Sequence, residues 1–299
     1  MKILVTGGAG FLGSHLVDAL IARGDQVVVF DDLSRGSYNQ IADGATFVEG
    51  DVRSIQDWEQ IFESHSPKVI HHLAAINGTR RFHKEADLVV DVNVNGTRNA
   101  LQLAERHGCR LIFYSSPESY GEQDSMPLSN DSESLFPPAH LHQRHSYGAS
   151  KHIGELLCQF AVKNGLDVRI VRPCNVYGPR LRGDDNGQVV SMMMAAEPIV
   201  VHGDGSQTRS LTWIGDVIEG LLTITDMGGL EGEAFNLGST DEITMLELAN
   251  MISEIRGVGI IHGDPNHGDS KRRLPDVSMN NKISWKANTS LTDGLAQLR

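Results

Sequence analysis

Short apolar runs and longer amphipathic segments alternate along the first half of the chain. The apolar runs do not alternate strictly with polar residues, which is typical of strands that are buried on both faces. They lie at residues 1–6, 25–31, 45–49, 68–72, 110–114 and 167–172. Segments with helical periodicity follow at residues 12–22, 55–64, 86–107 and 147–163. Strands and helices that alternate with short connections predict an α/β fold with a doubly wound parallel sheet.

The order of strands and helices becomes looser in the second half of the chain. Three further elements are expected there, a Met-rich helix, a short strand and a helix, at residues 192–196, 199–202 and 216–223. The methionines are more typical of core packing than of a binding surface. We therefore predict an NAD-binding Rossmann-like domain at residues 1–174 and a smaller α/β substrate-binding region at residues 175–299. A segment near residues 210–226 is expected to rejoin the first domain.

Three glycines separate the first predicted strand from the first predicted helix. Gly7, Gly10 and Gly13 recur at every third position. Glycines allow a tight turn, let backbone N–H groups approach a pyrophosphate and let the helix pack closely on the strand. The alternative is an ordinary glycine-rich turn, but this run has the preceding strand and the following helix that a dinucleotide site requires. The run therefore predicts phosphates at the N-terminus of the first helix.

A carboxylate ends the second predicted strand. Asp31 lies 18 residues after Gly13, near the spacing at which an acidic residue binds the ribose hydroxyls of adenosine. A carboxylate at this place repels the ribose 2'-phosphate of NADP, so Asp31, together with Asp32, favours NAD. Arg35 nearby is the feature that leaves NADP open as an alternative.

The composition argues against several classes of protein. The formal net charge is -12 at pH 7, which disfavours non-specific nucleic-acid binding and means that a phosphate ligand needs local arginines. Cys109, Cys158 and Cys174 form no C-x-x-C pair, so we expect no disulfide framework, no zinc site and a cytoplasmic location. No apolar run approaches the ~20 residues that cross a bilayer, and no signal peptide is evident. The histidines at residues 140–145 lack partner carboxylates or cysteines, so no metal site is expected.

Hydroxyl and carboxylate side chains follow the fifth predicted strand, at the edge where ligands bind in open α/β sheets. Ser116 and Glu118 lie in this segment, although a polar turn with a solvated carboxylate fits the spacing equally well. Tyr147 and Lys151 are four residues apart, so a helix presents both on one face. An ammonium near the phenol lowers its pKa from ~10, which makes Tyr147 a candidate general base. The alternative is an exposed tyrosine beside a solvated lysine.

Other polar positions are ambiguous by themselves. Asn93 lies within a predicted helix, where a solvated side chain is favoured over a buried one that bonds to a neighbouring backbone. Arg209, together with Arg272 or Arg273, would supply the paired guanidinium contacts that a diphosphate needs, and surface salt bridges are the alternative.

Taken together, these residues resemble a known family. The matching segments occur in the order Thr6-Gly-Gly-Ala-Gly-Phe-Leu-Gly13, Asp31, Asp51-Val52, Leu73-Ala-Ala75, Asn93-x-x-Gly96-Thr97, Ser115-Ser116, Tyr147-x-x-x-Lys151, Arg172-Pro173 and Asn175-x-x-Gly178-Pro179. Over essentially its whole length the chain is similar to the extended short-chain dehydrogenase/reductases, specifically to the NAD-dependent nucleotide-sugar epimerases and dehydratases.

The resemblance implies an enzyme that recycles NAD during each turnover. Tyr147 would take the proton from the sugar 4-hydroxyl while hydride passes to the nicotinamide, Ser116 would hydrogen-bond to that oxygen, and Lys151 would hold the ribose. Glu118 would be the fourth catalytic residue. The cofactor-binding residues would be Gly7, Gly10, Phe11, Leu12, Gly13, Asp31, Asp32, Asp51, Val52, Leu73, Ala74, Ala75, Asn93, Tyr147, Lys151 and Pro173. The substrate-binding residues would be Asn175, Val189, Val190, Arg209 and Arg273.

Three reactions through a 4-keto sugar are compatible with the resemblance. UDP-glucuronate decarboxylation ranks first, because Glu118, Arg144 and Arg273 match those enzymes, although Pro117 replaces their serine. A 4-epimerase acting on a UDP-hexose ranks second, although such enzymes usually have a small or hydroxyl residue in place of Glu118. A 4,6-dehydratase ranks third, because Pro117 stands where an aspartate transfers a proton. A non-catalytic NAD-binding sensor or scaffold is a further alternative, disfavoured by the intact Ser, Tyr and Lys positions.

The resemblance also implies partners. A UDP-sugar is the expected substrate, and neither nucleic acid nor a membrane is expected to bind. The helices that carry Asn93 and Tyr147 would form a four-helix interface in a homodimer.

Overall fold

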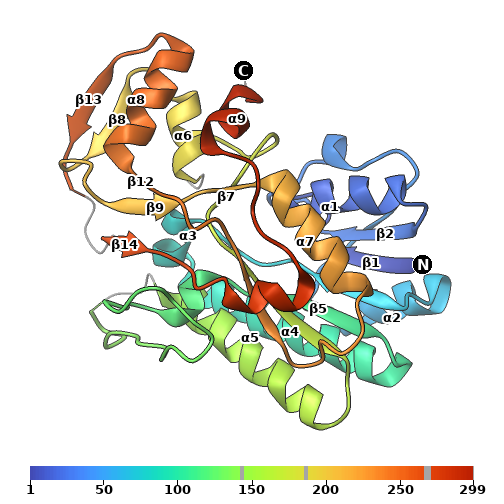
Figure 1. The fold of residues 1–299 in the computed structure, drawn as a ribbon. Helices are drawn as coiled ribbons and strands as arrows, with labels where there is room; N and C mark the ends of the chain where they lie inside the picture. The colour runs from blue at the N-terminus through green and yellow to red at the C-terminus, as the bar shows by residue number, and fades with distance from the viewer. Residues whose placement is uncertain (142–144, 185–187, 266–270, 299) are drawn as a thin grey trace.

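The structure of the chain is a computed structural model that describes residues 1–141, 145–184, 188–265 and 271–298. A seven-stranded parallel sheet forms its centre (Figure 1). In spatial order the strands are β11 (Ala234–Leu237), β6 (Val168–Pro173), β5 (Arg110–Tyr114), β4 (Val69–His72), β1 (Lys2–Thr6), β2 (Gln26–Asp31) and β3 (Thr46–Glu49). The order reverses between β1 and β4, which is the switch point of a doubly wound sheet. The predicted fold class is confirmed.

Alternate residues of the central strands are buried on opposite faces of the sheet. In β1, Ile3 and Val5 pack with the helices of one face, and Leu4 packs with those of the other. Figure 1 shows the two layers of helices. One face carries α1 (Phe11–Ala22) and α7 (Ile214–Asp226), and the other carries α2 (Ile55–His65), α4 (Ala86–His107) and α5 (Ser146–Lys163). Because both faces are covered, every strand of the sheet needs a nearly continuous apolar run.

The predicted strands and helices of the first half begin and end within two residues of their predicted bounds, and one short helix was missed there. Most elements of the second half were not predicted, among them one strand of the central sheet. The short helix α3 (Thr79–Lys84) has no apolar periodicity. The strand β11 consists of four buried residues, and it comes from the second half of the chain to extend the central sheet beside β6. A run this short is ambiguous without its partner strand.

The rest of the second half forms a smaller region beside the carboxyl ends of the central strands (Figure 1). Its small sheets pair β8 with β13, β7 with β10, and β9 with both β12 and β14. Its elements are β7 (Val176–Tyr177), α6 (Val189–Ala195), β8 (Ile199–His202), β9 (Thr208–Ser210), β10 (Thr212–Trp213), β12 (Glu242–Thr244), α8 (Met245–Arg256), β13 (Ile260–Gly263), β14 (Arg272–Arg273) and α9 (Leu291–Ala296). Helix α6 begins three residues before the predicted Met-rich helix, because Val189 and Val190 form its first turn.

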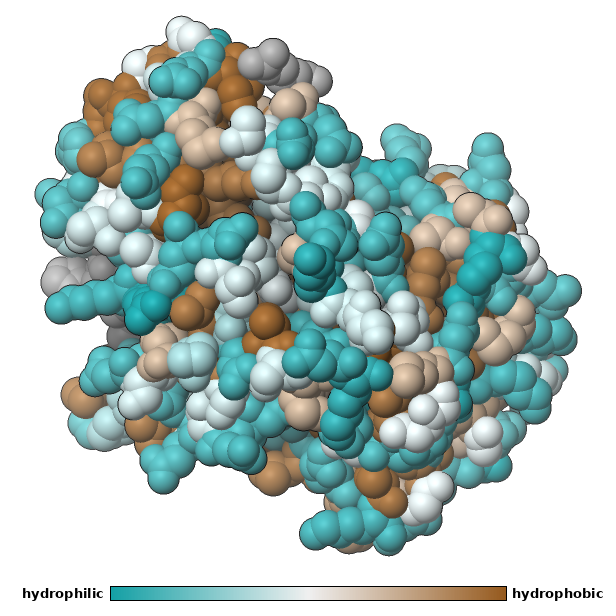
Figure 2. All heavy atoms as spheres, in the orientation of Figure 1, coloured by the Kyte–Doolittle hydropathy of each residue, from teal (hydrophilic) through white to brown (hydrophobic). Residues whose placement is uncertain are grey.

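The surface in Figure 2 is mostly hydrophilic, with hydrophobic residues gathered over the lobe that carries β8, β13 and α8. Val200 and Ile261 are among the exposed apolar side chains of this lobe. Within the described ranges, no helix has the length and apolar character needed to span a bilayer.

Two adjacent histidines lie inside the molecule at the end of β4. His71 and His72 are both fully buried. His71 hydrogen-bonds through Nδ1 with the Tyr114 hydroxyl at 3.0 Å and through Nε2 with Thr225 Oγ1 at 3.2 Å. His72 hydrogen-bonds through Nδ1 with Thr6 Oγ1 at 2.9 Å. Burial lowers the pKa of each imidazole to about 3, so both are neutral at neutral pH.

The free energy of unfolding is expected to fall as the pH decreases from 6.5, the ordinary histidine pKa, towards 3. In this window the unfolded chain binds protons at His71 and His72 that the folded chain does not bind, so stability is lost as the pH falls. Two such protons change the free energy of unfolding by ~2.7 kcal/mol per pH unit. Urea unfolding between pH 7 and pH 4 measures the slope. His71→Gln should make it shallower by ~1.4 kcal/mol per pH unit, and an unchanged slope would contradict the assignment.

Candidate active site

A cleft of about 810 Å³ lies along the carboxyl ends of the central strands and continues under the C-terminal region. The loops after β1, β2, β4, β5 and β6 all contribute to its wall, as expected at a topological switch point. All but one of the predicted site residues line it, namely Gly7, Gly10, Phe11, Leu12, Gly13, Asp31, Asp32, Asp51, Val52, Leu73, Ala74, Ala75, Ser116, Glu118, Tyr147, Lys151, Pro173, Asn175, Val189, Val190, Arg209 and Arg273. Tertiary structure thus brings together residues from both halves of the chain.

Asn93 is the predicted residue that lies behind the wall. Its side chain is buried, its Oδ1 accepts the Ile76 backbone N–H at 2.8 Å, and its Nδ2 donates to Ser150 Oγ at 3.0 Å. The interpretation of Asn93 as a solvated helix residue was therefore wrong, because α4 faces the interior here. Asn93 supports the cleft through Ile76, which does line it.

The glycine loop has no room for side chains. Gly7 has a φ of 70°, and a Cβ on it would lie 2.8 Å from the backbone nitrogen of Ala74. A Cβ on Gly13 would lie 2.2 Å from the Gly7 carbonyl oxygen. The glycines therefore let β1, the turn and α1 approach closely and leave the backbone facing the cleft. This cradle fits the pyrophosphate of a dinucleotide.

The carboxylate of Asp31 is fixed at the edge of the cleft. Its Oδ2 accepts the Ala9 N–H at 3.0 Å, and its Oδ1 accepts the Leu33 N–H at 2.9 Å. Burial raises the pKa of Asp31, and these two hydrogen bonds oppose the rise. Arg35, the residue that left NADP open, forms an ion pair with Asp184 at 3.1 Å. A fixed carboxylate in the ribose position, with the nearby guanidinium directed to another acid, fits NAD.

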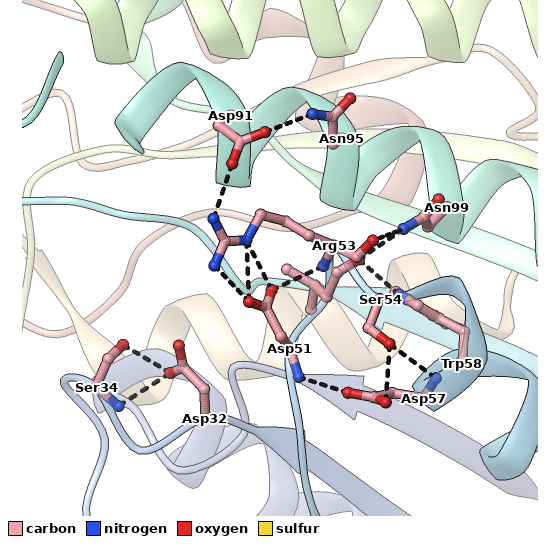
Figure 3. A network of polar contacts seen from close by, with 11 residues as sticks. Asp32, Ser34, Asp51, Arg53, Ser54, Asp57, Trp58, Asp91, Asn95 and Asn99 are labelled. Carbon is pink, nitrogen blue, oxygen red and sulfur yellow. Dashed lines mark hydrogen bonds and ion pairs between the residues drawn. The ribbon is translucent and has the colours of Figure 1, made fainter. Parts of the chain in front are cut away.

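A network of ion pairs holds the loop after β3 (Figure 3). Arg53 donates to both carboxylate oxygens of Asp51 and, through Nη1, to Asp91 of α4 at 2.8 Å. Asn99 of α4 donates to the carbonyl oxygens of Val52 and Arg53 at 3.0 and 2.9 Å. Hydrogen bonds from Arg53 hold the pKa of Asp51 below its usual value. Helix α4 thus fixes the loop that carries two predicted cofactor contacts, Asp51 and Val52.

Replacing Arg53 by Met is expected to weaken NAD binding by about 3- to 10-fold, because the Asp51 carboxylate then has to be ordered during binding. The NAD dissociation constant, measured by titration calorimetry after removal of bound NAD, tests this. Arg106→Met is the matched control, since Arg106 of α4 pairs with Glu59 of α2 at 2.8 Å, and neither residue is part of the cleft lining. Equal effects of the two substitutions would contradict a specific role for Arg53.

Tyr147 and Lys151 lie side by side within the cleft, both almost fully buried. The alternative of an exposed tyrosine and a solvated lysine is therefore wrong. Lys151 Nζ donates to the Tyr114 carbonyl oxygen at 2.7 Å and lies 5.8 Å from the Tyr147 ring centroid. Burial lowers the pKa of Lys151 to about 8. Phe82 of α3 stacks on the Tyr147 ring with 4.9 Å between centroids.

The expected lowering of the Tyr147 pKa is not found in the chain alone. Burial raises the pKa of Tyr147 above its usual value of 10, a hydrogen bond with Ser116 opposes the rise, and the nearby Glu118 charge adds to it. The ammonium of Lys151 is engaged by a backbone carbonyl, so desolvation outweighs it. The residues of the chain therefore leave the phenol protonated at neutral pH.

Arg209 and Arg273 are two of the arginines that line the part of the cleft formed by the C-terminal region. Arg209 of β9 and Arg273 of β14 are register partners on adjacent parallel strands. Arg273 Nη2 pairs with Glu118 at 3.2 Å, and its Nη1 donates to the Pro117 carbonyl oxygen at 3.2 Å. Arg272 points elsewhere and pairs with Glu242. Of Arg272 and Arg273, the two candidates for a diphosphate contact, Arg273 lies at the cleft. The Glu118 carboxylate is held there by its ion pair with Arg273.

Other residues complete the predicted substrate side. Asn175 has a φ of 42°, and its Nδ2 donates to the Ser210 carbonyl oxygen at 2.9 Å. Val189 and Val190 form the first turn of α6 and line the cleft. Arg144, which matched the decarboxylases, lies outside the described residues. In the ranges that the structure covers, no cluster of His, Cys, Asp and Glu is suited to a metal ion.

Sequence reasoning missed several residues at or near the cleft. Asn77 and Phe82, from the segment that ends in α3, line the wall, but no periodicity or motif marks them. Arg180 lines the cleft too and pairs with Asp18 of α1 at 2.6 Å. Glu155 supports the site from α5 and lies four residues after Lys151, a helical spacing that was visible in the sequence.

Comparison with known proteins shows which family the chain belongs to. Residues 3–238 match the model of the NAD-dependent epimerase/dehydratase family. UDP-glucuronic acid decarboxylase 1 of Arabidopsis thaliana is 35% identical over 100% of this chain and 69% of its own length. UDP-N-acetyl-alpha-D-glucosaminuronate decarboxylase of Bacillus cytotoxicus is 33% identical, with 99% and 96% covered. The crystal structure of a Thermotoga maritima UDP-glucose 4-epimerase with UDP-glucose superimposes with a TM-score of 0.92 at 30% identity, covering 99% of this chain and 97% of that one. The chain therefore belongs to the NAD-dependent epimerase/dehydratase family of enzymes, and NAD is its cofactor.

Proposed function

We propose that this protein decarboxylates a UDP-hexuronate through a 4-keto intermediate. The observation that carries the proposal is the ion pair of Glu118 and Arg273, which lies in the cleft with the Ser116 and Tyr147 side chains. A guanidinium at this place can bind a sugar carboxylate in two-point fashion. Arg209 would then bind the diphosphate, and an uncharged hexose offers Arg273 no second anion. The names of the two decarboxylase relatives point the same way.

The chemistry follows from the positions of the side chains. NAD held by the glycine turn and Asp31 would supply the acceptor for the C4 hydride of the sugar and, later, its donor. Tyr147 would accept the proton of the 4-hydroxyl once the positive charge of bound NAD favours its phenolate, and Ser116 would hydrogen-bond to the same substrate oxygen. The resulting 4-ketone is a β-keto acid, so the C5–C6 bond breaks to release carbon dioxide and leaves an enolate across C4 and C5. A water molecule oriented by the Glu118 carboxylate would then protonate C5, and Tyr147 would return its proton to the 4-oxygen as the hydride returns to C4.

The substrate assay tests this proposal directly. Purified protein is incubated separately with UDP-glucuronate, UDP-glucose and their N-acetylamino counterparts, and product masses are measured. Loss of carbon dioxide from a UDP-uronate is the expected result. An isomer of unchanged mass from a UDP-hexose would instead establish a 4-epimerase, the second candidate, which the likeness to the Thermotoga maritima enzyme favours. Loss of water would establish a dehydratase, and Pro117 argues against that outcome.

We further propose that a second copy of the chain covers the outer face of α4 and α5. These helices pack on each other, and their outer surface exposes Val90, Ile153, Leu156 and Phe160. Leu156 and Phe160 are 58% and 66% exposed. Apolar side chains grouped in this way on two adjacent helices fit a four-helix contact with an identical pair.

The variant Leu156→Glu/Phe160→Glu is expected to be monomeric, because two carboxylates would be buried in the proposed interface without partners. Light scattering coupled to size-exclusion chromatography gives the mass of the wild-type and variant particles. Ile261→Glu is the matched control, since Ile261 is 49% exposed but belongs to β13. A monomeric wild-type protein, or a dimer that survives the double substitution, would contradict the proposed interface.

A further inference from the structure

A buried ion pair lies beneath the loop that follows β5. Glu155 of α5 and Arg172 of β6 have side chains that are 13% and 7% exposed. Arg172 donates through Nη2 to Glu155 Oε2 at 2.6 Å and through Nε to Oε1 at 2.8 Å. Burial would raise the pKa of Glu155, but the hydrogen bonds and charge of Arg172, together with the hydrogen bonds from Ser115 and Ser119, outweigh it, and the pKa lies below the usual 4.5. Both groups therefore stay charged, and within the described chain neither is part of the cleft lining.

The Glu155 carboxylate holds the loop on both sides of Ser116. Ser115 Oγ donates to Oε1, and Ser119 Oγ donates to the same oxygen at 3.2 Å. Between these two serines lie Ser116 and Glu118, whose side chains face the cleft. The backbone there is a single 3-10 turn, Pro117–Tyr120. A turn of this length is too short to fix its own position, so side-chain contacts must do so.

Arg172 extends the contacts to the other side of the loop. Its Nη1 donates to the Tyr120 hydroxyl at 2.8 Å and to Asn130 Oδ1 at 2.6 Å, and its guanidinium lies 4.8 Å from the centroid of the Tyr120 ring. The Tyr120 hydroxyl donates to Asn236 of β11 at 3.1 Å. Asn236 Nδ2 in turn donates to the carbonyl oxygen of Asp276 at 2.9 Å, in the segment just after β14. The network thus joins α5, the β5 loop, β6, β11 and the C-terminal segment.

Helix α5, the β5 loop, β6 and the C-terminal segment each supply residues to the cleft lining. Tyr147 and Lys151 precede Glu155 by eight and four residues on α5, so the three side chains share one face of the helix. The β5 loop packs directly on that helix next to Tyr147, because a Cβ on Gly148 would lie 2.3 Å from the Glu118 carbonyl oxygen, and Ser116 and Tyr147 both line the cleft. Ser116 can act together with Tyr147 only when the loop and the helix keep this spacing, and Glu155 bonds directly to Ser115 before the turn and to Ser119 within it.

We propose that Glu155 and Arg172 are positioning residues that hold Ser116 against Tyr147 for proton transfer. They act through the loop and do not touch the substrate. Misplacing a reacting group by ~1 Å can cost about 100-fold in rate. A purely structural ion pair would affect stability and leave the rate of the folded enzyme unchanged. The proposal uses turnover as one readout and in that respect rests on the proposed function.

The test compares the wild-type chain with Glu155→Leu/Arg172→Met. The double substitution removes both charges together, and apolar replacements of a buried pair often keep the fold intact. The variant is expected to retain NAD, while kcat falls about 10- to 100-fold and KM changes less than about threefold. Amide hydrogen exchange of the peptide 115–121, followed by mass spectrometry, is expected to become faster at temperatures well below unfolding.

Two further variants keep the test decisive if the double variant folds poorly. Arg172→Lys retains the charge beside Glu155 but cannot bind Glu155, Tyr120 and Asn130 at once, so it should show the same split of kcat and KM in milder form. Arg169→Met is the matched control. Arg169 is also a buried arginine of β6, but it lies near the opposite end of the strand and pairs with Asp167 at 3.1 Å. It should lower the melting temperature and leave both kcat and the exchange of residues 115–121 unchanged.

Three results would overturn the proposal. The first is a folded double variant with wild-type kcat and wild-type exchange of residues 115–121. The second is wild-type kcat and exchange in a folded Arg172→Lys variant. The third is an Arg169→Met control whose kcat falls as far as that of the Arg172 variants. A wild-type chain that converts no substrate contradicts the proposed function, and the exchange comparison then decides the positioning role without any substrate.

Discussion

Tyr147→Phe is expected to abolish turnover and to leave the fold and NAD binding intact. The substitution removes only the hydroxyl of a tyrosine that lines the cleft together with Ser116. The ring remains and keeps its stacking contact with Phe82 at 4.9 Å. Loss of a positioned proton-transfer group costs about 100- to 10,000-fold in rate. Product formation by the wild-type and variant proteins, with NAD content measured in the same samples, gives the result.

A second buried tyrosine provides the control. Tyr177 is 1% exposed, and among the residues that the structure describes its hydroxyl has no hydrogen-bond partner. Tyr177→Phe removes the same atom type from the core without touching the cleft lining. It should leave kcat unchanged and, because a buried unpaired hydroxyl is costly, should not lower stability. Comparable losses of activity in both variants would show that Tyr147 contributes through packing instead of proton transfer.

Gly13→Ala is expected to cause the largest loss of cofactor affinity. The added Cβ would lie 2.2 Å from the Gly7 carbonyl oxygen and 2.8 Å from the Gly8 Cα. Both neighbours are backbone atoms, so the turn itself has to move. A shift that costs ~1.4 to 2.8 kcal/mol in the bound geometry weakens NAD binding about 10- to 100-fold. Retention of NAD during purification and a titration of the stripped protein measure the effect.

Gly228→Ala is the matched control for this loop. The added Cβ would have no heavy-atom neighbour within 4 Å among the described residues, and Gly228 has no positive φ. Its melting temperature and its NAD affinity should both match the wild type. If Gly13→Ala binds NAD as tightly as Gly228→Ala does, the glycine turn is not the pyrophosphate site.

The apolar runs were sufficient to predict the first six strands of the central sheet. All of these runs except the edge strand β3 are buried on both faces, so their apolar residues are continuous and easy to recognise. The edge strand β11 and the helix α3 were not predictable in the same way. β11 has four residues and becomes a strand because β6 offers it a partner. α3 has no apolar stripe, and only its position over Tyr147 shows its role.

The sequence indicated which residues belong to the candidate site, but it did not show how buried those residues are or which groups surround them. A spacing of four placed Tyr147 and Lys151 on one face of a helix, but it did not say that the face is buried. Burial raises the pKa of Tyr147, and a carbonyl oxygen takes up the Lys151 ammonium. The lowered pKa that the spacing predicted for Tyr147 is not found, because desolvation depends on all the residues that pack around Tyr147 and Lys151.

The sequence by itself determined the sheet, the glycine turn and the acid after the second strand, because each of these depends on neighbouring residues and on backbone sterics. It also marked the residues that form the cleft. Only the tertiary structure decided which of them face it. Asn93 faces the interior and binds the Ile76 backbone. Arg273 lies at the cleft and pairs with Glu118, whereas Arg272 pairs with Glu242. These contacts are between residues that are far apart in the sequence. A local sequence pattern does not show how close such residues lie in the folded chain.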